Sequence, residues 1–235
     1  EWSIADLVKQ YTSIINATTP DDPLNLERDD LTLQNIQARS RAPGIWMIAN
    51  RYNKLLMSTC NASEDAVGYC TMDGDTAGGV APLGGLSKSR ILEINRRIAA
   101  APLKVRGKCV FNLPAMAAVA CQEPTAELRA GQTDERDLMP YVILDRIHEL
   151  QQGCRLLPSE VCARLREDFP ELGAEQAWEY VRRYFARLAS SQWKRERGAV
   201  SFHLESCDLS AGRGFDMPVL NGGLSGLLPD EAPAS

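Results

Sequence analysis

The chain has 235 residues, of which 44% are hydrophobic and 24% are charged, an ordinary globular composition. No apolar run approaches the roughly 18–20 residues that cross a bilayer, so no membrane span is expected. Lys and Arg total 26 against 31 Asp and Glu, a net charge of −5. An acidic chain is poorly suited to wrapping nucleic acid, although it can hold a local basic pocket for a small anion.

The cysteine pattern argues against a metal or disulfide scaffold. There are seven cysteines and two histidines, His148 and His203, and no CxxC pair occurs. A zinc site needs clustered ligands at short spacings, and disulfide scaffolds are typical of shorter secreted chains. We therefore expect reduced thiols, mostly buried, in a cytoplasmic protein.

The amino-terminal third is predicted to be helical. Apolar residues recur at helical spacing from Ile4 to Ile15, and a polar, proline-broken loop follows at 18–23. A second helix is expected over residues 31–50, where Pro43 could introduce a kink. The apolar run 54–58 is just long enough for one buried strand, the only convincing strand in the sequence.

Loops and helices are predicted for the rest of the chain. The glycine-rich run 74–85 reads as a loop, Ser87 can cap a helix through Ile98, and Asn112 and Pro114 open a short helix. Residues 122–140 form a long polar loop of the kind that often acts as a lid. Three helices follow near residues 141–152, 159–168 and 174–196, then an irregular tail that is disordered over 224–235.

These elements predict an α/β fold. A single apolar strand, followed by a glycine-rich loop and flanked by helices, fits the end of a parallel sheet better than an all-α domain. No linker divides the chain into two domains.

Polar residues after the predicted strand are the first candidates for a site, because open α/β sheets bind ligands at the carboxyl ends of their strands. Glu64 could hold a divalent cation such as magnesium, or could simply favour the dipole of a helix that begins there. Lys88 stands at a helix start, where a cation opposes the dipole. It is either a phosphate ligand or a solvated lysine.

The basic residues elsewhere in the chain can be interpreted either as ligand-binding groups or as structural charges. Arg39 and Arg41 could grip a phosphate or carboxylate, or could belong to a charged solvent face. The run 193–197 places cations at a helix end, where they are favourable for structural reasons. No Ser/His/Asp or Cys/His constellation is present.

Four strings in one order identify a resemblance. They are NIQARSRAPGIW (35–46), LLMSTCNASEDAVGYCTMDGDTAGGVAPLGGLSK (55–88), PTAELRAGQTDERDLMPY (124–141) and QWKRERGAVSFHL (192–204). Together they closely resemble the carboxyl-terminal part of NAD+ synthetase, especially the glutamine-dependent bacterial type. The resemblance runs to about residue 223.

The resemblance implies a Rossmann-like, adenine nucleotide α-hydrolase-like α/β fold. It also implies NAD+ biosynthesis in two steps. ATP adenylates the nicotinate carboxylate of deamido-NAD+, and ammonia from a glutaminase domain then displaces AMP. Mg2+ would be the cofactor, and the protein is expected to be a cytoplasmic homo-oligomer.

Site residues are carried over position by position. The resemblance assigns Thr59, Lys88 and Thr125 to ATP, and Glu64 to magnesium. It assigns Arg39, Asp75 and Lys194 to deamido-NAD+. Met72 and Gly79 replace a lysine and an aspartate of the ammonia-dependent enzymes, which fits the glutamine-dependent type better.

The family's phosphate-binding motif SGGxDS does not occur in this sequence. We therefore expect an amino-terminally incomplete chain over residues 1–223, inactive by itself, whose sheet keeps one or a few parallel strands. Two alternatives stay open: an ammonia-dependent synthetase, and a non-enzymatic remnant that serves as a binding or dimerisation module.

Overall fold

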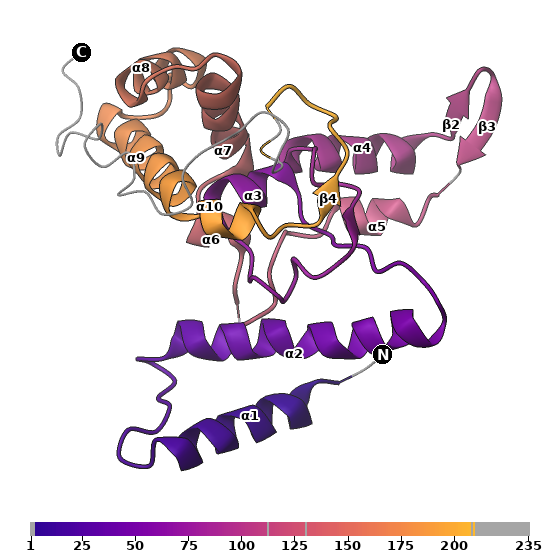
Figure 1. Cartoon of the computed structure of the whole chain (residues 1–235). Coiled ribbons are helices and arrows are strands. Elements are labelled where there is room, and N and C mark those ends of the chain that lie inside the picture. Colours follow the sequence, from indigo (N-terminus) through magenta and orange to yellow (C-terminus); the bar gives the residue numbers. More distant parts are fainter. Residues whose placement is uncertain (1–2, 112, 130, 208, 210–235) are drawn as a thin grey trace.

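The computed structural model describes residues 3–111, 113–129, 131–207 and 209. These residues are mainly helical (Figure 1). The helices are α1 (Ala5–Thr18), α2 (Asp30–Arg51), α3 (Ala62–Val67), α4 (Lys88–Ala100), α5 (Met116–Ala120), α6 (Asp134–Asp137), α7 (Tyr141–His148), the π-helix η1 (Glu149–Gly153), α8 (Pro158–Asp168), α9 (Ala174–Ser190) and α10 (Gln192–Arg195). The strands are β1 (Val80–Ala81), β2 (Leu103–Val105), β3 (Lys108–Phe111) and β4 (Val200–Ser201).

The hydrophobic core lies where α3, α7, α8 and α9 meet. Helix α9 presents apolar side chains at helical spacing toward the other three. Each fully buried aliphatic side chain contributes roughly 1.5–3 kcal/mol of burial free energy. The side chains at most 1% exposed include Ala66, Val67, Leu144, Ile147, Val161, Leu165, Val181 and Leu188.

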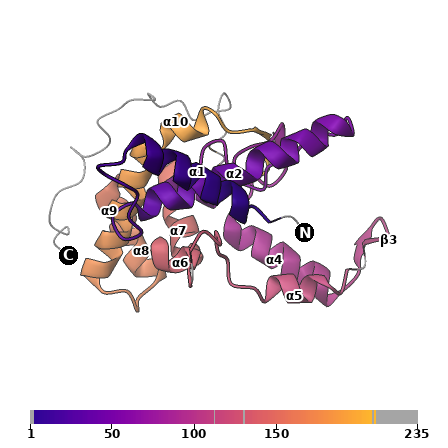
Figure 2. The ribbon, with the colours of Figure 1, turned by 90° about the horizontal axis from the view of Figure 1, so that it is seen from below.

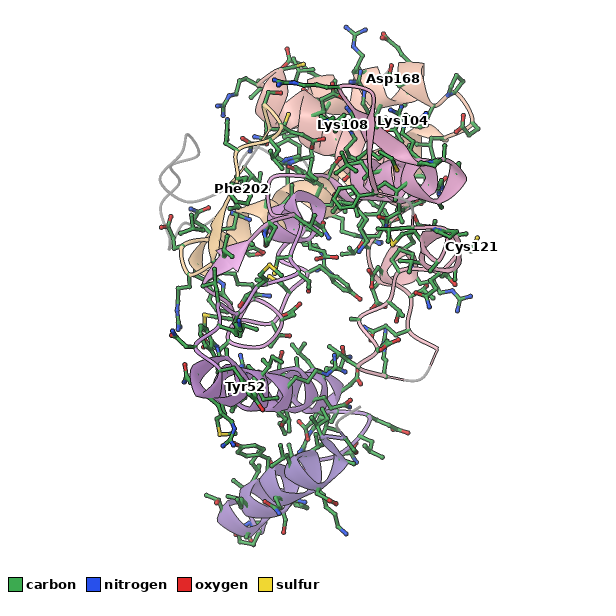
Figure 3. All side chains as sticks on the ribbon, turned by 90° about the vertical axis from the view of Figure 1, so that its right-hand side faces the viewer. Tyr52, Lys104, Lys108, Cys121, Asp168 and Phe202 are labelled. Carbon is green, nitrogen blue, oxygen red and sulfur yellow. The ribbon has the colours of Figure 1, made fainter. Side chains whose placement is uncertain are left out.

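Helices α1 and α2 form a separate layer. They run antiparallel below the other elements (Figure 1), and α1 covers α2 when the molecule is seen from below (Figure 2). No described residue of α1 is buried. Helix α2 runs through Pro43 without ending, and the residues it buries are small: Ala38, Ser40, Ala42, Gly44 and Ala49. Figure 3 shows Tyr52, which follows α2, and Asp168, the last residue of α8, in opposite layers.

The predicted buried strand at 54–58 is wrong. That segment makes only an isolated parallel bridge, Met57 with Val80 of β1, and Leu55 and Met57 are 67% and 62% exposed. Its backbone bonds run to one side, from Ser58 N to the Val80 carbonyl and from Gly79 N to the Leu56 carbonyl. The small parallel sheet is formed by β1 and β4 instead. Strand β1 lies within the predicted loop 74–85, and β4 lies in the predicted irregular tail.

An antiparallel hairpin, β2–β3, was not predicted. Arg106 and Gly107 form its two-residue turn with φ values of +50° and +77°. A two-residue turn containing glycine between alternating apolar residues is a known hairpin signal. Every residue of both strands is exposed, and the hairpin projects from the end of α4, with Lys104 and Lys108 on it (Figures 1 and 3).

Most predicted helices are confirmed, and the differences are local. The predicted loop 122–140 contains α6, the helix expected over 174–196 breaks at Ser191, and the one expected over 141–152 ends in π-helix. All seven thiols are free, but only Cys60 and Cys162 are buried. The expectation of mostly buried cysteines is wrong because Cys109 lies on the exposed hairpin, and Cys121 and Cys154 are exposed at the ends of α5 and η1. The boundary at residue 223 and the tail 224–235 fall outside the described residues.

Candidate functional site

Two adjoining cavities collect the predicted site residues. The first, the Lys88 cavity, has a volume of about 490 Å³ and is lined by Thr59, Glu64, Lys88 and Thr125. The second, the Lys194 cavity, has a volume of about 540 Å³ and is lined by Arg39 and Lys194. Four residues line both, namely Tyr69, Asp75, Ala126 and Leu128.

Glu64 is positioned by the first turn of α3. Asn61 is the N-cap in extended backbone, and its Oδ1 accepts a hydrogen bond from Glu64 N at 3.1 Å. Asparagine is among the residues preferred at a helix N-cap. Burial raises the pKa of Glu64, against the opposing effect of the Lys88 ammonium.

Lys88 is neither solvated nor unpartnered. Its Nζ lies 2.9 Å from Glu64 Oε1, and the two side chains are 19% and 15% exposed. The ion pair accounts for a lysine at the start of α4, where the helix dipole alone disfavours it. The ammonium keeps further N–H donors that could meet an anionic ligand in the cavity.

Asp145, which the sequence did not suggest, ties the starts of α3 and α4 together. One carboxylate oxygen accepts a hydrogen bond from Ser63 Oγ, and the other accepts from Ser89 N at 2.9 Å. Ser63 Oγ in turn accepts from Lys88 N at 2.7 Å. The only sequence signal for Asp145 is that it is the single acid among the apolar residues of α7. It fixes the backbone from which Glu64 and Lys88 project.

Asp134 forms a further part of the Lys88 cavity. It is 3% exposed, and its Oδ2 accepts from Tyr141 Oη at 2.9 Å. Its Oδ1 has no hydrogen-bond partner among the described residues. The Tyr141 ring also faces Lys88, whose Nζ lies 5.4 Å from the ring centroid.

Lys194 is held at the end of α3. Its Nζ donates to the carbonyls of Gly68 and Cys70, both at 2.7 Å. The neighbouring Arg195 Nη1 donates to the Asp65 and Ala66 carbonyls at 3.0 and 3.1 Å. Lys194 and Arg195 of the basic run 193–197 therefore do bind carbonyls at a helix carboxyl end. That helix is α3, which is distant in the sequence, and not the helix that carries the run.

Gly68 allows this close approach. It ends α3 with φ +61°, a conformation that favours glycine. A Cβ there would lie 2.1 Å from Ser191 Oγ. The glycine therefore lets α10 seat against α3 with Lys194 turned into the cavity.

Arg39 lies between the Lys194 cavity and a third cavity of about 800 Å³, the Tyr11 cavity. Its Nε donates to the Met72 carbonyl at 3.1 Å. Arg197, expected only as part of the basic run at a helix end, pairs with Asp73 at 3.1 Å and also lines the Tyr11 cavity. Two guanidinium groups thus border the same opening.

Asp75 shapes the loop that separates the cavities. Its carboxylate accepts from Thr71 N at 2.6 Å, and its carbonyl accepts from Ser58 Oγ at 3.2 Å. The loop also packs closely on α2, since a Cβ at Gly74 would lie 3.1 Å from the Ala38 carbonyl carbon.

The segment carrying Thr125 bridges to α2. Thr125 Oγ1 donates to the Gln132 carbonyl at 2.7 Å. Gln37 and Arg41 of α2 donate to the carbonyls of Leu128 and Glu127 at 3.0 and 3.2 Å. Arg41 is therefore more than a solvent-exposed charge, since it binds the predicted lid segment from α2.

The carboxylates of the Lys88 cavity could hold a hard cation only with the help of further ligands. No group of three or more His, Cys, Asp or Glu among the described residues is arranged as a metal site. Mg²⁺, however, is usually held by one or two carboxylates together with substrate phosphates and water. A Glu64 carboxylate facing the cavity, together with the unpartnered oxygen of Asp134, meets that smaller requirement.

Comparisons with known proteins agree on one family. Residues 1–197 match the family model described as NAD synthase. The glutamine-dependent NAD(+) synthetase of Rhodobacter capsulatus is 38% identical over 172 residues, which cover 72% of this chain and 29% of that protein. The enzyme of the same name from Synechocystis is 30% identical over 224 residues, covering 92% and 34%.

A solved structure gives the same result. The crystal structure of a glutamine-dependent NAD(+) synthetase from Cytophaga hutchinsonii matches with a TM-score of 0.79 and 36% identity, over 97% of this chain and 34% of that one. The expected fold, mostly helical with few parallel strands, is thereby confirmed. The chain spans about a third of the length of these relatives. Within the described residues, helices are too short or too polar to cross a membrane.

Proposed function

The chain belongs to the NAD synthase family, and we propose that it carries much of the synthetase site of a glutamine-dependent NAD+ synthetase. The reaction is the ATP-dependent amidation of deamido-NAD+. The nicotinate carboxylate attacks the α-phosphorus of ATP, releasing pyrophosphate and forming an acyl-adenylate. Ammonia then attacks the acyl carbon, and AMP leaves.

The observation that carries this proposal is the convergence of the seven predicted residues. Thr59, Glu64, Lys88 and Thr125 line one cavity, Arg39 and Lys194 line its neighbour, and Asp75 lines both. A bi-substrate reaction needs two sites that meet, so that the carboxylate of one substrate reaches the phosphorus of the other. Two cavities that share lining residues support such an arrangement.

The Lys88 cavity is the proposed ATP site. The Lys88 ammonium would meet phosphate oxygens, and Thr59 and Thr125 would supply hydroxyl groups. Glu64 would hold magnesium, which when bound offsets the negative charge that grows on the leaving pyrophosphate. The Lys194 cavity is the proposed deamido-NAD+ site, where Arg39 and Lys194 supply positive charge for an anionic dinucleotide.

The wider setting is part of the same proposal. Ammonia would come from a glutaminase domain, as the names of the relatives suggest. A cytoplasmic homo-oligomer is the expected form of the enzyme.

A binding experiment separates the two cavities. We expect calorimetry on the chain to show Lys88→Met weakening ATP and Lys194→Met weakening deamido-NAD+. Each loss should be about 10–100-fold, because a hydrogen bond to a charged group contributes about 1.5–3 kcal/mol. Lys104→Met, on the exposed hairpin, is the control and should change neither affinity. Equal weakening of both ligands by both site variants would contradict the division of the site.

A further inference from the structure

Asp134 has an unusual position for an acid. It is 3% exposed, yet it lines the Lys88 cavity. One oxygen accepts the Tyr141 hydroxyl hydrogen at 2.9 Å, and the other has no partner among the described residues. A buried carboxylate oxygen without a partner is costly, so its retention points to a ligand that enters from the cavity. The Thr133 hydroxyl also lacks a partner within the part of the chain that the structure describes, but Thr133 does not line the cavity.

The described groups around Asp134 donate no hydrogen bond to this oxygen. Tyr141 has one hydroxyl hydrogen, which it donates to Oδ2. The Lys88 ammonium is 2.9 Å from Glu64 Oε1 and 5.4 Å from the centre of the Tyr141 ring. The cavity is lined by three carboxylates, from Glu64, Asp75 and Asp134, and by two cationic side chains, from Lys88 and Arg41, so its lining carries a formal net negative charge.

We infer that Asp134 is a second protein ligand of the divalent cation, binding through Oδ1 in the cavity that Glu64 also lines. The inference rests on the proposed role of Glu64 in holding magnesium. Hard divalent cations take carboxylate oxygens, and two of these with phosphate and water complete the usual magnesium shell. Tyr141 acts as a positioning residue, since its hydroxyl holds Asp134 through the oxygen that the metal does not use.

Mn²⁺ is a suitable probe, because its binding to the chain can be followed by electron paramagnetic resonance without any turnover. We expect the parent chain to bind one Mn²⁺. Asp134→Asn and Glu64→Gln should each weaken that binding by at least about 100-fold, and Tyr141→Phe by about 10–100-fold, as for partners that orient metal ligands. Glu123→Gln, which removes an exposed carboxylate of the preceding loop, is the matched control and should bind as the parent does.

Thermal unfolding gives an independent readout. Without metal, Asp134→Asn should melt at or above the parent temperature, because it removes an unpaired buried charge. Mn²⁺ should raise the melting temperature of the parent but not of this variant. A purely structural Asp134 would instead give a less stable variant that still binds Mn²⁺.

Two results would overturn the inference. One is Mn²⁺ binding by Asp134→Asn within threefold of the parent while Glu64→Gln loses it. The other is no Mn²⁺ binding by the parent. Failure of the proposed function would give a different result: the parent chain would not bind ATP or deamido-NAD+, while the Mn²⁺ results would stay as expected.

Discussion

The core around α9 and the α1–α2 layer are held by different means. The core helices α3, α7, α8 and α9 interlock large apolar side chains, with Leu144, Val181 and Leu188 at 0% exposure. In the other layer, α1 buries none of its described residues, and α2 buries only small residues, of which Ala38 packs against the loop at Gly74. Most of the folding stability therefore comes from the core helices, because the free energy gained by burial scales with the apolar area removed from water.

The proposed site lies on the boundary between these regions. Glu64 and Lys88 project from elements that pack on the core, whereas Arg39 and Arg41 come from α2. Polar contacts join the two sides, such as Arg39 to the Met72 carbonyl and Arg41 to the Glu127 carbonyl. Contacts of this kind are weaker than core packing, so we expect the boundary to open more easily than the core unfolds.

The largest expected effect tests the comparison directly. Leu144→Ala, at 0% exposure in α7, should lower the free energy of unfolding by about 2–5 kcal/mol. Ile14→Ala, at 61% exposure in α1, should lower it by less than about 0.5 kcal/mol. Urea unfolding followed by circular dichroism measures both. Equal losses would mean that α1 packs as tightly as the core.

A pair of glycines sharpens the contrast. Gly68 and Gly107 have φ values of +61° and +77°. Gly107→Ala should cost about 1 kcal/mol of strain, because open space surrounds it. Gly68→Ala should cost about 3 kcal/mol, because the added Cβ also meets Ser191 Oγ. Adding Ser191→Gly should recover part of the Gly68→Ala loss and none of the Gly107→Ala loss, as measured by denaturant unfolding.

The sequence predicted what is locally encoded. Helix α1 follows from the helical spacing of its apolar residues, and the cap of α3 is local because the Asn61 acceptor lies only three residues from Glu64. The seven site residues came from four strings that keep their order. Each such signal lies within one segment of the chain.

Long-range features could not be read in this way. The run 54–58 has the composition of a buried strand, but burial depends on tertiary neighbours, and Leu55 and Met57 are 67% and 62% exposed. Asp145 joins Ser63 to Ser89, and Arg41 reaches Glu127, across large sequence separations. The unpartnered oxygen of Asp134 is likewise a property of packing, and no spacing in the sequence reveals it.

The pH dependence of stability tests the core side of the boundary. Burial raises the pKa of Glu64 above its ordinary value of 4.5, with Lys88 opposing. The folded state then holds the proton more tightly, so the stability contributed by this group is greatest below pH 4.5 and is lost as pH rises through the folded pKa. The parent should therefore gain stability relative to Glu64→Gln as pH falls from 7 toward 4.5. A difference that does not change with pH would contradict the raised pKa.

The smallest expected effect on global stability concerns the α2 side. Arg41→Ala removes the bond to the Glu127 carbonyl at 3.2 Å, and one such bond contributes about 0.5–1.5 kcal/mol locally. Amide exchange at Glu127 and Leu128, whose N–H groups bond Thr125 and Gln132 side chains, should quicken about 2–10-fold. Global unfolding should change by less than about 0.5 kcal/mol. Arg164→Ala, which breaks an exposed pair on α8, should leave these amides unchanged.

Ligands should act on the same segment in the opposite direction. If residues 122–138 close over ATP and deamido-NAD+, both ligands together should slow exchange at Glu127 and Leu128, because a closed lid excludes water from the adenylate. The core amides of α9 should not respond, since their protection depends on global unfolding. Slowing in α9 as well would show that ligands tighten the whole molecule. Unchanged exchange at both amides would mean that this segment stays fixed on α2 and does not close as a lid.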